Sequence, residues 1–167
     1  ISTSPVSRSV KDQALQALII ALKDQDSQVR RGASSSLGKI GRNSSEVISA
    51  FEDLFRESDD PIMRKTAIEN LAGRMPSEKR VPLLVNALKD QNKDVRKTAL
   101  VVVDFYKVYS PEIVALLIKI IKMDKSAAVR DRAIRVMEKI LPASKAYSPE
   151  VVNVLIEIIK KEKDGTV

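Results

Sequence analysis

The chain has 167 residues, 44% of them hydrophobic and 31% charged, a composition typical of a folded helical protein rather than a disordered one. Its 29 basic and 22 acidic residues give a net charge of +7, which permits an acidic partner without requiring one. Because cysteine and histidine are both absent, disulfides, ordinary zinc sites and the Ser–His–Asp and Cys–His catalytic arrangements are excluded.

The N-terminal region carries neither a signal peptide nor an apolar run long enough to cross a membrane. The longest apolar runs, such as Leu18–Leu22, are far shorter than the roughly 20 residues that a bilayer requires. We therefore expect a cytoplasmic protein without membrane contact. Since the first residue is Ile1 rather than methionine, we also expect the chain to be part of a larger protein. Residues 1–6 are predicted to form a disordered tail, with room for a short helical turn near Ser7–Lys11.

From residue 12 onward, the sequence predicts pairs of helices, here called helix A and helix B. Two of the A helices begin with the same Ser-Pro-Glu sequence, at Ser110 and at Ser148. A serine N-cap, a proline at the first helical position and an acid in the first turn all favour a helix start. The segments predicted as A helices are Leu15–Lys23, Val47–Arg56, Val81–Lys89, Ile113–Lys122 and an unpaired last one, Val151–Lys161.

Each B helix is predicted from a block of eight residues that recurs four times without gaps. Every block begins with a residue suited to cap a helix and continues with an apolar residue, an arginine and an alanine at constant spacing. An apolar residue follows four positions after each alanine, as one buried helical stripe requires. The blocks are Asp26–Ala33, Asp60–Ala67, Asn92–Ala99 and Ser126–Ala133.

The arginines of the four blocks are 34, 32 and 34 residues apart, so the repeating unit is a helical hairpin of about 33 residues. One such hairpin cannot bury its apolar face alone, but stacked copies can. We expect nine helices in a repeat domain over residues 7–162, followed by a tail at 163–167. The expected repeats cover about residues 12–42, 45–75, 77–108 and 110–142, with a terminal helix at 148–162.

The segment Ala21–Gly41, with the sequence ALKDQDSQVRRGASSSLGKIG, resembles a HEAT-like repeat. It is most similar to the short variety named after the phycobilisome lyases, A-L-x-D-x-D-x-x-V-R-x-x-A-x-x-A-L-G-x-I-G. The resemblance covers roughly residues 12–162 and is weaker in the second repeat, where Met63 replaces the valine. Tetratricopeptide repeats have a similar period, but this chain lacks their tryptophan, glycine and tyrosine signature. The resemblance implies an all-α fold, a right-handed α-solenoid of about four and a half hairpins.

The resemblance also implies a structural role for the recurring arginine. In HEAT-like families this side chain binds backbone carbonyls or the aspartate of a neighbouring repeat. We therefore expect a structural ladder rather than a ligand site, formed by Arg30, Arg64, Arg96 and Arg130.

HEAT-like solenoids line their concave face with the B helices and use that face for binding. The residue after each ladder arginine recurs once per repeat, which suggests a basic row. The alternative is a solvated polar stripe without a ligand. For Val101 and Phe105, which lie off the buried stripe, we expect burial in the core, with an exposed patch as the alternative. The candidate binding residues are Arg31, Lys65, Lys97, Val101, Arg132 and Arg135.

These features predict a non-catalytic scaffold that binds a protein partner with an acidic or mixed surface. The alternative is a nucleic-acid-binding module that uses the basic row. We expect no enzyme activity, no cofactor and no small-molecule substrate, because histidine, the commonest general base, and nucleophilic cysteine are absent and no glycine-rich phosphate loop is found. The acids near Asp24 and Asp59 are spaced for turns and caps and do not match a calcium loop, so no metal site is expected.

Overall fold

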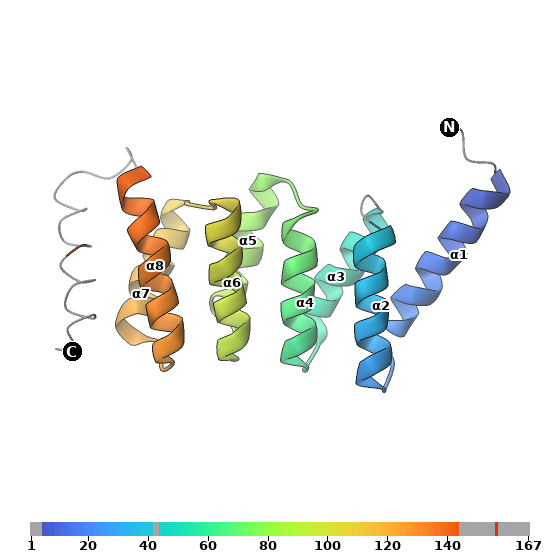
Figure 1. The fold of residues 1–167 in the computed structure, drawn as a ribbon, viewed down its shortest axis with the longest axis horizontal. Helices are drawn as coiled ribbons and strands as arrows, with labels where there is room; N and C mark the ends of the chain where they lie inside the picture. Colours follow the sequence, from blue (N-terminus) through green and yellow to red (C-terminus); the bar gives the residue numbers. More distant parts are fainter. Residues whose placement is uncertain (1–4, 42–43, 144–155, 157–167) are drawn as a thin grey trace. The chain divides into compact units, whose positions relative to one another are not determined.

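A computed structural model describes residues 5–41, 44–143 and 156 of the chain, and in this part it contains eight α-helices and no strand (Figure 1). The expected all-α class is therefore confirmed. The terminal A helix predicted at Val151–Lys161 and the tail at 163–167 fall outside the described residues, apart from residue 156. The helices are α1 (Pro5–Ala21), α2 (Ser27–Ile40), α3 (Ser45–Glu57), α4 (Pro61–Ala72), α5 (Ser77–Ala87), α6 (Lys93–Tyr106), α7 (Pro111–Met123) and α8 (Ala127–Ala143).

The N-terminal helix is longer than expected. Helix α1 runs without a break from Pro5 to Ala21, so the prediction of a separate turn near Ser7–Lys11 is wrong, and the helix already includes Pro5 and Val6, which were assigned to the tail. The physical reason is local. Proline is favourable at the first helical position, and no glycine or further proline interrupts the segment that follows.

The turn between the two helices of a hairpin is defined by N-cap side chains. Asp26 accepts hydrogen bonds from the backbone N–H groups of Gln28 and Val29, at 2.6 and 3.4 Å. Asp60 and Asn92 cap α4 and α6 in the same way. Each cap satisfies amides that have no partner within the helix. Gly41 and Gly73 follow the last residues of α2 and α4 as their C-caps, where the sequence placed helix ends.

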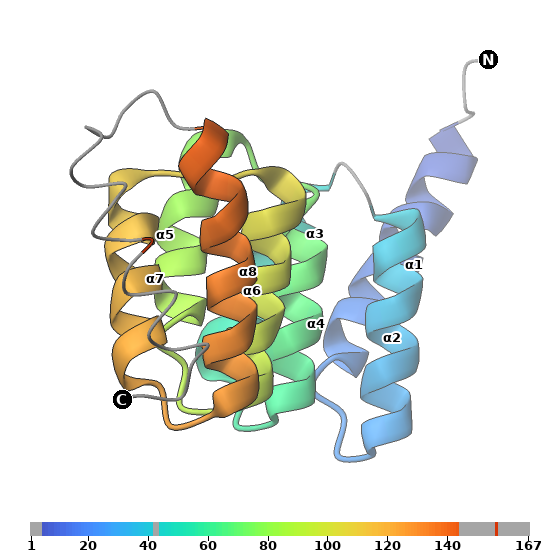
Figure 2. The same cartoon turned by 60° about the vertical axis from the view of Figure 1, so that its left-hand side comes forward.

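The described residues belong to two compact units, one within residues 1–75 and the other within residues 76–167. In the first unit, α1 packs against α2, and α3 packs against α4. The two hairpins then stack B on B, with α2 against α4, and A on A, with α1 against α3 (Figure 1). The second unit repeats this arrangement with α5 and α7 as A helices and α6 and α8 as B helices (Figure 2).

Each unit is held together by the apolar stripe that the repeat predicted. Ala33 is 4% exposed, and the alanines at the equivalent positions of the other three repeats, Ala67, Ala99 and Ala133, are fully buried. Leu37, Leu71, Val103 and Met137, four residues further along, are fully buried as well. Small side chains at the alanine positions allow close packing, and the larger residues one turn later fill the space between helices.

Two glycines of α2 differ in what surrounds them. A Cβ atom added at Gly38 would lie 2.9 Å from Oδ1 of Asn70, because α2 and α4 approach closely there. Asn70 is held in place, since it donates to the carbonyl of Thr66 and accepts from Arg74. A Cβ atom at Gly32 would meet nothing within 4 Å. Gly38 is therefore required by packing, whereas Gly32 only weakens the helix.

We predict that Gly32→Ala raises the free energy of unfolding by about 1 kcal/mol, the difference in helix propensity between the two residues. Gly38→Ala makes the same gain in propensity but displaces Asn70, so it should give no stabilisation or a net loss. Urea unfolding followed by circular dichroism measures both. An equal gain for the two variants would contradict the close approach of α2 and α4.

Candidate binding surface

The four ladder arginines close the turns between the helices of each hairpin. Each donates from Nη1 to the backbone carbonyl six residues earlier, over 2.8–2.9 Å in all four repeats. In the first three repeats the same nitrogen also reaches the carbonyl five residues earlier, at 2.9–3.1 Å. These carbonyls have no helical partner, so a fixed cation satisfies them. The ladder arginines are Arg30, Arg64, Arg96 and Arg130.

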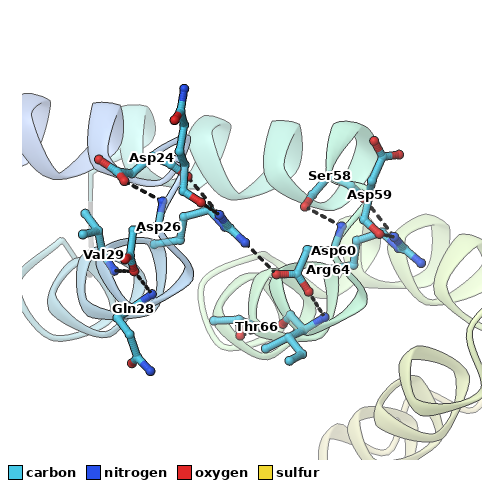
Figure 3. Close-up of polar contacts among 12 residues, drawn as sticks. Asp24, Asp26, Gln28, Val29, Ser58, Asp59, Asp60, Arg64 and Thr66 are labelled. Atoms are coloured by element: carbon cyan, nitrogen blue, oxygen red, sulfur yellow. Dashed lines mark hydrogen bonds and ion pairs between the residues drawn. The ribbon is translucent and has the colours of Figure 1, made fainter.

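A second local contact tightens the same turns. The backbone N–H of the N-cap residue donates to the side chain two residues earlier, from Asp26 to Asp24 at 2.8 Å and from Asp60 to Ser58 at 3.2 Å (Figure 3). Equivalent bonds of 2.8 and 2.9 Å occur in the third and fourth repeats. Aspartate and serine are suited to such turns, because their short side chains reach nearby backbone groups.

Arg30 and Arg96 also bind an acid of the next repeat. Arg30 donates from Nη2 to Asp60 at 3.0 Å, and Arg96 holds both oxygens of Asp124, at 2.6 and 2.7 Å. The Arg96–Asp124 pair is bidentate, and the Asp124 side chain is only 6% exposed. Burial by itself raises the pKa of both aspartates, but hydrogen bonds from the arginine and the backbone outweigh it. The pKa of each therefore lies below its ordinary value.

The two acids occupy different positions in their repeats. Asp60 is the N-cap residue of α4, whereas Asp124 lies two residues before the N-cap position. In the second repeat the position two residues before the N-cap holds Ser58, which carries no charge. Arg30 therefore binds the N-cap residue Asp60 instead. All four ladder arginines therefore bind the carbonyls of their own turns, and Arg30 and Arg96 also join adjacent repeats.

The candidate basic row is divided between the two units. Arg31 and Lys65 lie on α2 and α4 of the first unit, and Lys97 is exposed on α6 of the second. In the part of the chain that the structure describes, none of these three forms an ion pair. Arg132 and Arg135 differ, because Arg132 donates to Asp104 at 3.0 Å and Arg135 pairs with Asp131 on the same helix. The C-terminal end of the row is thus neutralised by acids.

Asp104 is a residue that sequence reasoning missed. It lies on α6 and binds two cations of α8, Arg132 at 3.0 Å and Lys139 at 2.8 Å. The only signal in the sequence was an acid within the otherwise apolar segment Leu100–Tyr106. Spacing alone does not reveal which neighbouring helix supplies the cations, so Lys139 was missed with it.

The expectation that Val101 and Phe105 are buried is wrong. Their side chains are 44% and 76% exposed, while Val102 and Val103 on the same helix are buried. The two exposed residues are four positions apart and share the face of α6 that points away from the core. The ring of Phe105 contacts Tyr106 edge-on at 4.9 Å, and the guanidinium of Arg80 covers Tyr106 at 4.7 Å. Tyr106 is thereby supported from α5, and Phe105 is left open to solvent.

The repeat geometry agrees with a comparison to known families. The family model described as HEAT repeats matches residues 7–72 and 81–167. The chain belongs to the HEAT-repeat family. The predicted resemblance to HEAT-like repeats and the predicted fold class of stacked helical hairpins are therefore confirmed. A particular similarity to the phycobilisome-lyase variety of the repeat stays a prediction. No curated protein matches the chain.

No cluster of three or more acids that could hold a metal ion occurs among the described residues. None of their helices is long and apolar enough to cross a membrane. Helix α6, a B helix, presents an exposed stripe of Lys97, Val101 and Phe105. The ion pairs of Asp104 flank this stripe.

We predict that Asp124→Asn lowers the free energy of unfolding by about 1.5–3 kcal/mol, the range for a lost hydrogen bond to a charged group. The amide oxygen still accepts from the N–H of Ser126, so the change removes the charge that pairs with Arg96 and keeps the contact within the turn. Asp131→Asn is the matched control. It breaks the exposed pair with Arg135 and should change stability by less than about 0.5 kcal/mol. Similar losses in both variants would contradict a special role for Asp124.

The stability of the protein should also depend on pH through the lowered pKa values of Asp60 and Asp124. A carboxylate whose pKa is lower in the folded state stabilises that state fully above its unfolded pKa of about 3.9. That stabilisation is lost as the pH falls through the folded value. The difference in unfolding free energy between the wild type and Asp124→Asn should therefore be constant near neutrality and shrink below about pH 4. Chemical unfolding at a series of pH values tests this, and a difference that persists unchanged below pH 3 contradicts it.

Proposed function

We propose that the chain is a non-catalytic scaffold module that binds a protein partner through its B helices, with the main contact on α6 and α8. The proposed contact, called the α6–α8 patch, consists of Lys97, Val101, Asp104, Phe105, Arg132 and Lys139. Proteins of the HEAT-repeat family commonly serve as interaction scaffolds, which agrees with this proposal. A cytoplasmic location remains a prediction.

The observation that carries the proposal is the exposure of Phe105. Its side chain is 76% exposed, and the half-exposed Val101 lies one turn before it, so the two form a continuous apolar strip. Single exposed apolar residues are ordinary on protein surfaces, but an aromatic residue within a strip is a common anchor for a partner. Burying such a ring contributes about 1.5–3 kcal/mol.

The charges around the strip favour a protein partner over nucleic acid. Asp104 sits between Arg132 and Lys139, so the patch carries cations that are already partly neutralised. A phosphate backbone would have to approach this carboxylate, which is unfavourable. A protein surface with mixed or acidic groups can instead exchange ion pairs at the rim while it buries Phe105.

The basic row supports a second candidate, binding of nucleic acid. Within the described residues, Arg31, Lys65 and Lys97 form no ion pair, and the chain has a net charge of +7. Real phosphate contacts make affinity fall steeply with salt. A filter-binding titration of the chain with DNA and RNA at two salt concentrations tests this candidate, and absence of retention at low salt excludes it.

We predict that Phe105→Ser weakens partner binding by about thirtyfold, the effect expected for a buried aromatic anchor. Because the ring is exposed in the free protein, stability should change by less than about 0.5 kcal/mol. Met123→Ser is the control, since that side chain is 72% exposed on α7, outside the patch. A pull-down from the native host, quantified by mass spectrometry, should recover a protein with the wild type and Met123→Ser and lose it with Phe105→Ser. Equal recovery with all three would rule out the α6–α8 patch.

A further inference from the structure

The first unit contains a groove between its two A helices, α1 and α3. It has a volume of about 910 Å³, within the range of typical ligand sites. Its apolar lining comes from Ile19 on α1, from Leu22 in the turn that follows α1, and from Ala50 and Leu54 on α3. Leu22 and Leu54 are buried, while Ile19 and Ala50 are half-buried and accessible from outside. The groove therefore offers an apolar floor to another molecule.

Acidic side chains surround this floor. Six of the residues that line the groove are acids (Asp24, Glu46, Asp53, Glu57, Asp59 and Asp60), and two are bases, Lys23 and Arg30. Six negative and two positive charges give a local balance of −4, on a chain whose net charge is +7. The groove is thus opposite in charge to the molecule as a whole, so it attracts cationic groups that the rest of the surface repels.

The acids that surround the apolar floor, here called the rim of the groove, keep most of their negative charge. Arg30 is bound to Asp60, but Lys23 approaches Glu57 only to 3.8 Å, and both of those side chains are largely exposed. The hydroxyl of Ser44 donates to Glu46, and this bond lowers the pKa of the Glu46 carboxyl, which stays ionised. Within the described part of the chain, Asp53 pairs with the exposed Arg56. Exposed pairs of this kind exchange readily, so the rim acids are available to an incoming cation.

The repeat frame does not require an acid at two of these positions, Asp53 and Asp59. Arg64 and Arg130 are equivalent ladder positions 66 residues apart, and the same offset relates Ser44 to Ser110, the N-caps of α3 and α7. With this offset, Asp53 corresponds to Lys119, and Asp59 corresponds to Lys125. The fourth repeat therefore folds with lysine at both positions. Asp53 and Asp59 are therefore not needed by the fold, and their negative charge beside the groove points to a ligand.

We infer that this groove binds a basic amphipathic segment of a partner protein, with apolar side chains on its floor and lysine or arginine at its rim. An apolar floor favours a peptide over a free metal ion, and among the described residues no acid cluster fit for a metal occurs. The acidic rim repels nucleic acid. The site belongs to the first unit and the α6–α8 patch to the second, so the two share no residue, and the site is opposite to the basic row in charge.

The experiment measures the fluorescence anisotropy of a labelled amphipathic leucine–lysine peptide titrated with the full chain. The double variant Asp53→Lys with Asp59→Lys places in the rim the residues that the fourth repeat carries there. Its control is Glu69→Lys with Asp94→Lys, the same change in charge at exposed residues that do not line the groove. Ile19→Gln tests the floor, and Ile20→Gln is its control, because Ile20 is 73% exposed on the same helix and lies outside the groove.

The peptide should bind the wild type, and the rim variant should weaken binding at least about tenfold, since two exposed ion pairs are replaced by repulsion. Ile19→Gln should weaken it about fivefold, and both controls should stay within about twofold of the wild type. Phe105→Ser should leave peptide binding unchanged, which separates this site from the proposed scaffold contact. The inference is overturned if the wild type does not bind, if a leucine–glutamate peptide binds equally well, or if the controls lose as much. It is also overturned if sedimentation shows a dimer that Ile19→Gln dissociates, because the groove would then be filled by a second copy.

Discussion

The bond from each ladder arginine to the carbonyls of its own turn is the contact on which the hairpins depend. The turn must reverse the chain within a few residues, and it leaves carbonyl groups without helical partners. A guanidinium 2.8–2.9 Å from the carbonyl six residues earlier satisfies them in all four repeats. It thereby sets the distance between helix A and helix B, and the buried alanines can pack only when that distance is maintained.

The acid that binds a ladder arginine across two repeats varies in its sequence position, whereas the carbonyl bound within the turn always lies six residues before the arginine. Arg30 finds its acid at the N-cap of the next repeat, and Arg96 finds it two residues before that position. A long, flexible arginine with several donors reaches either carboxylate, so the repeats can differ in sequence and still stack. The acid can move because the guanidinium is anchored on the carbonyls first.

A frame held by internal contacts leaves the outer residues free to diverge between repeats. Acids line the groove of the first unit, and lysines occupy the positions of the fourth repeat that correspond to Asp53 and Asp59. The third repeat presents an exposed aromatic strip, at Val101 and Phe105. A scaffold that contacts chemically different partners requires this combination, a constant interior with surfaces of different charge and polarity on successive repeats.

The helices, their caps and the buried stripe could be predicted from the sequence, because each depends on residues within one or two helical turns. Asp26 caps its helix through backbone groups two and three residues away, independently of the rest of the chain. Arg30 likewise binds carbonyls only five and six residues earlier. The tertiary structure decided which surfaces are open. Phe105 is exposed because a stacked repeat covers only part of α6, and Arg132 is neutralised because α6 brings Asp104 beside it. Such outcomes depend on which face of a helix meets its neighbour, and residues 28 positions apart in the chain carry no periodic signal of their contact.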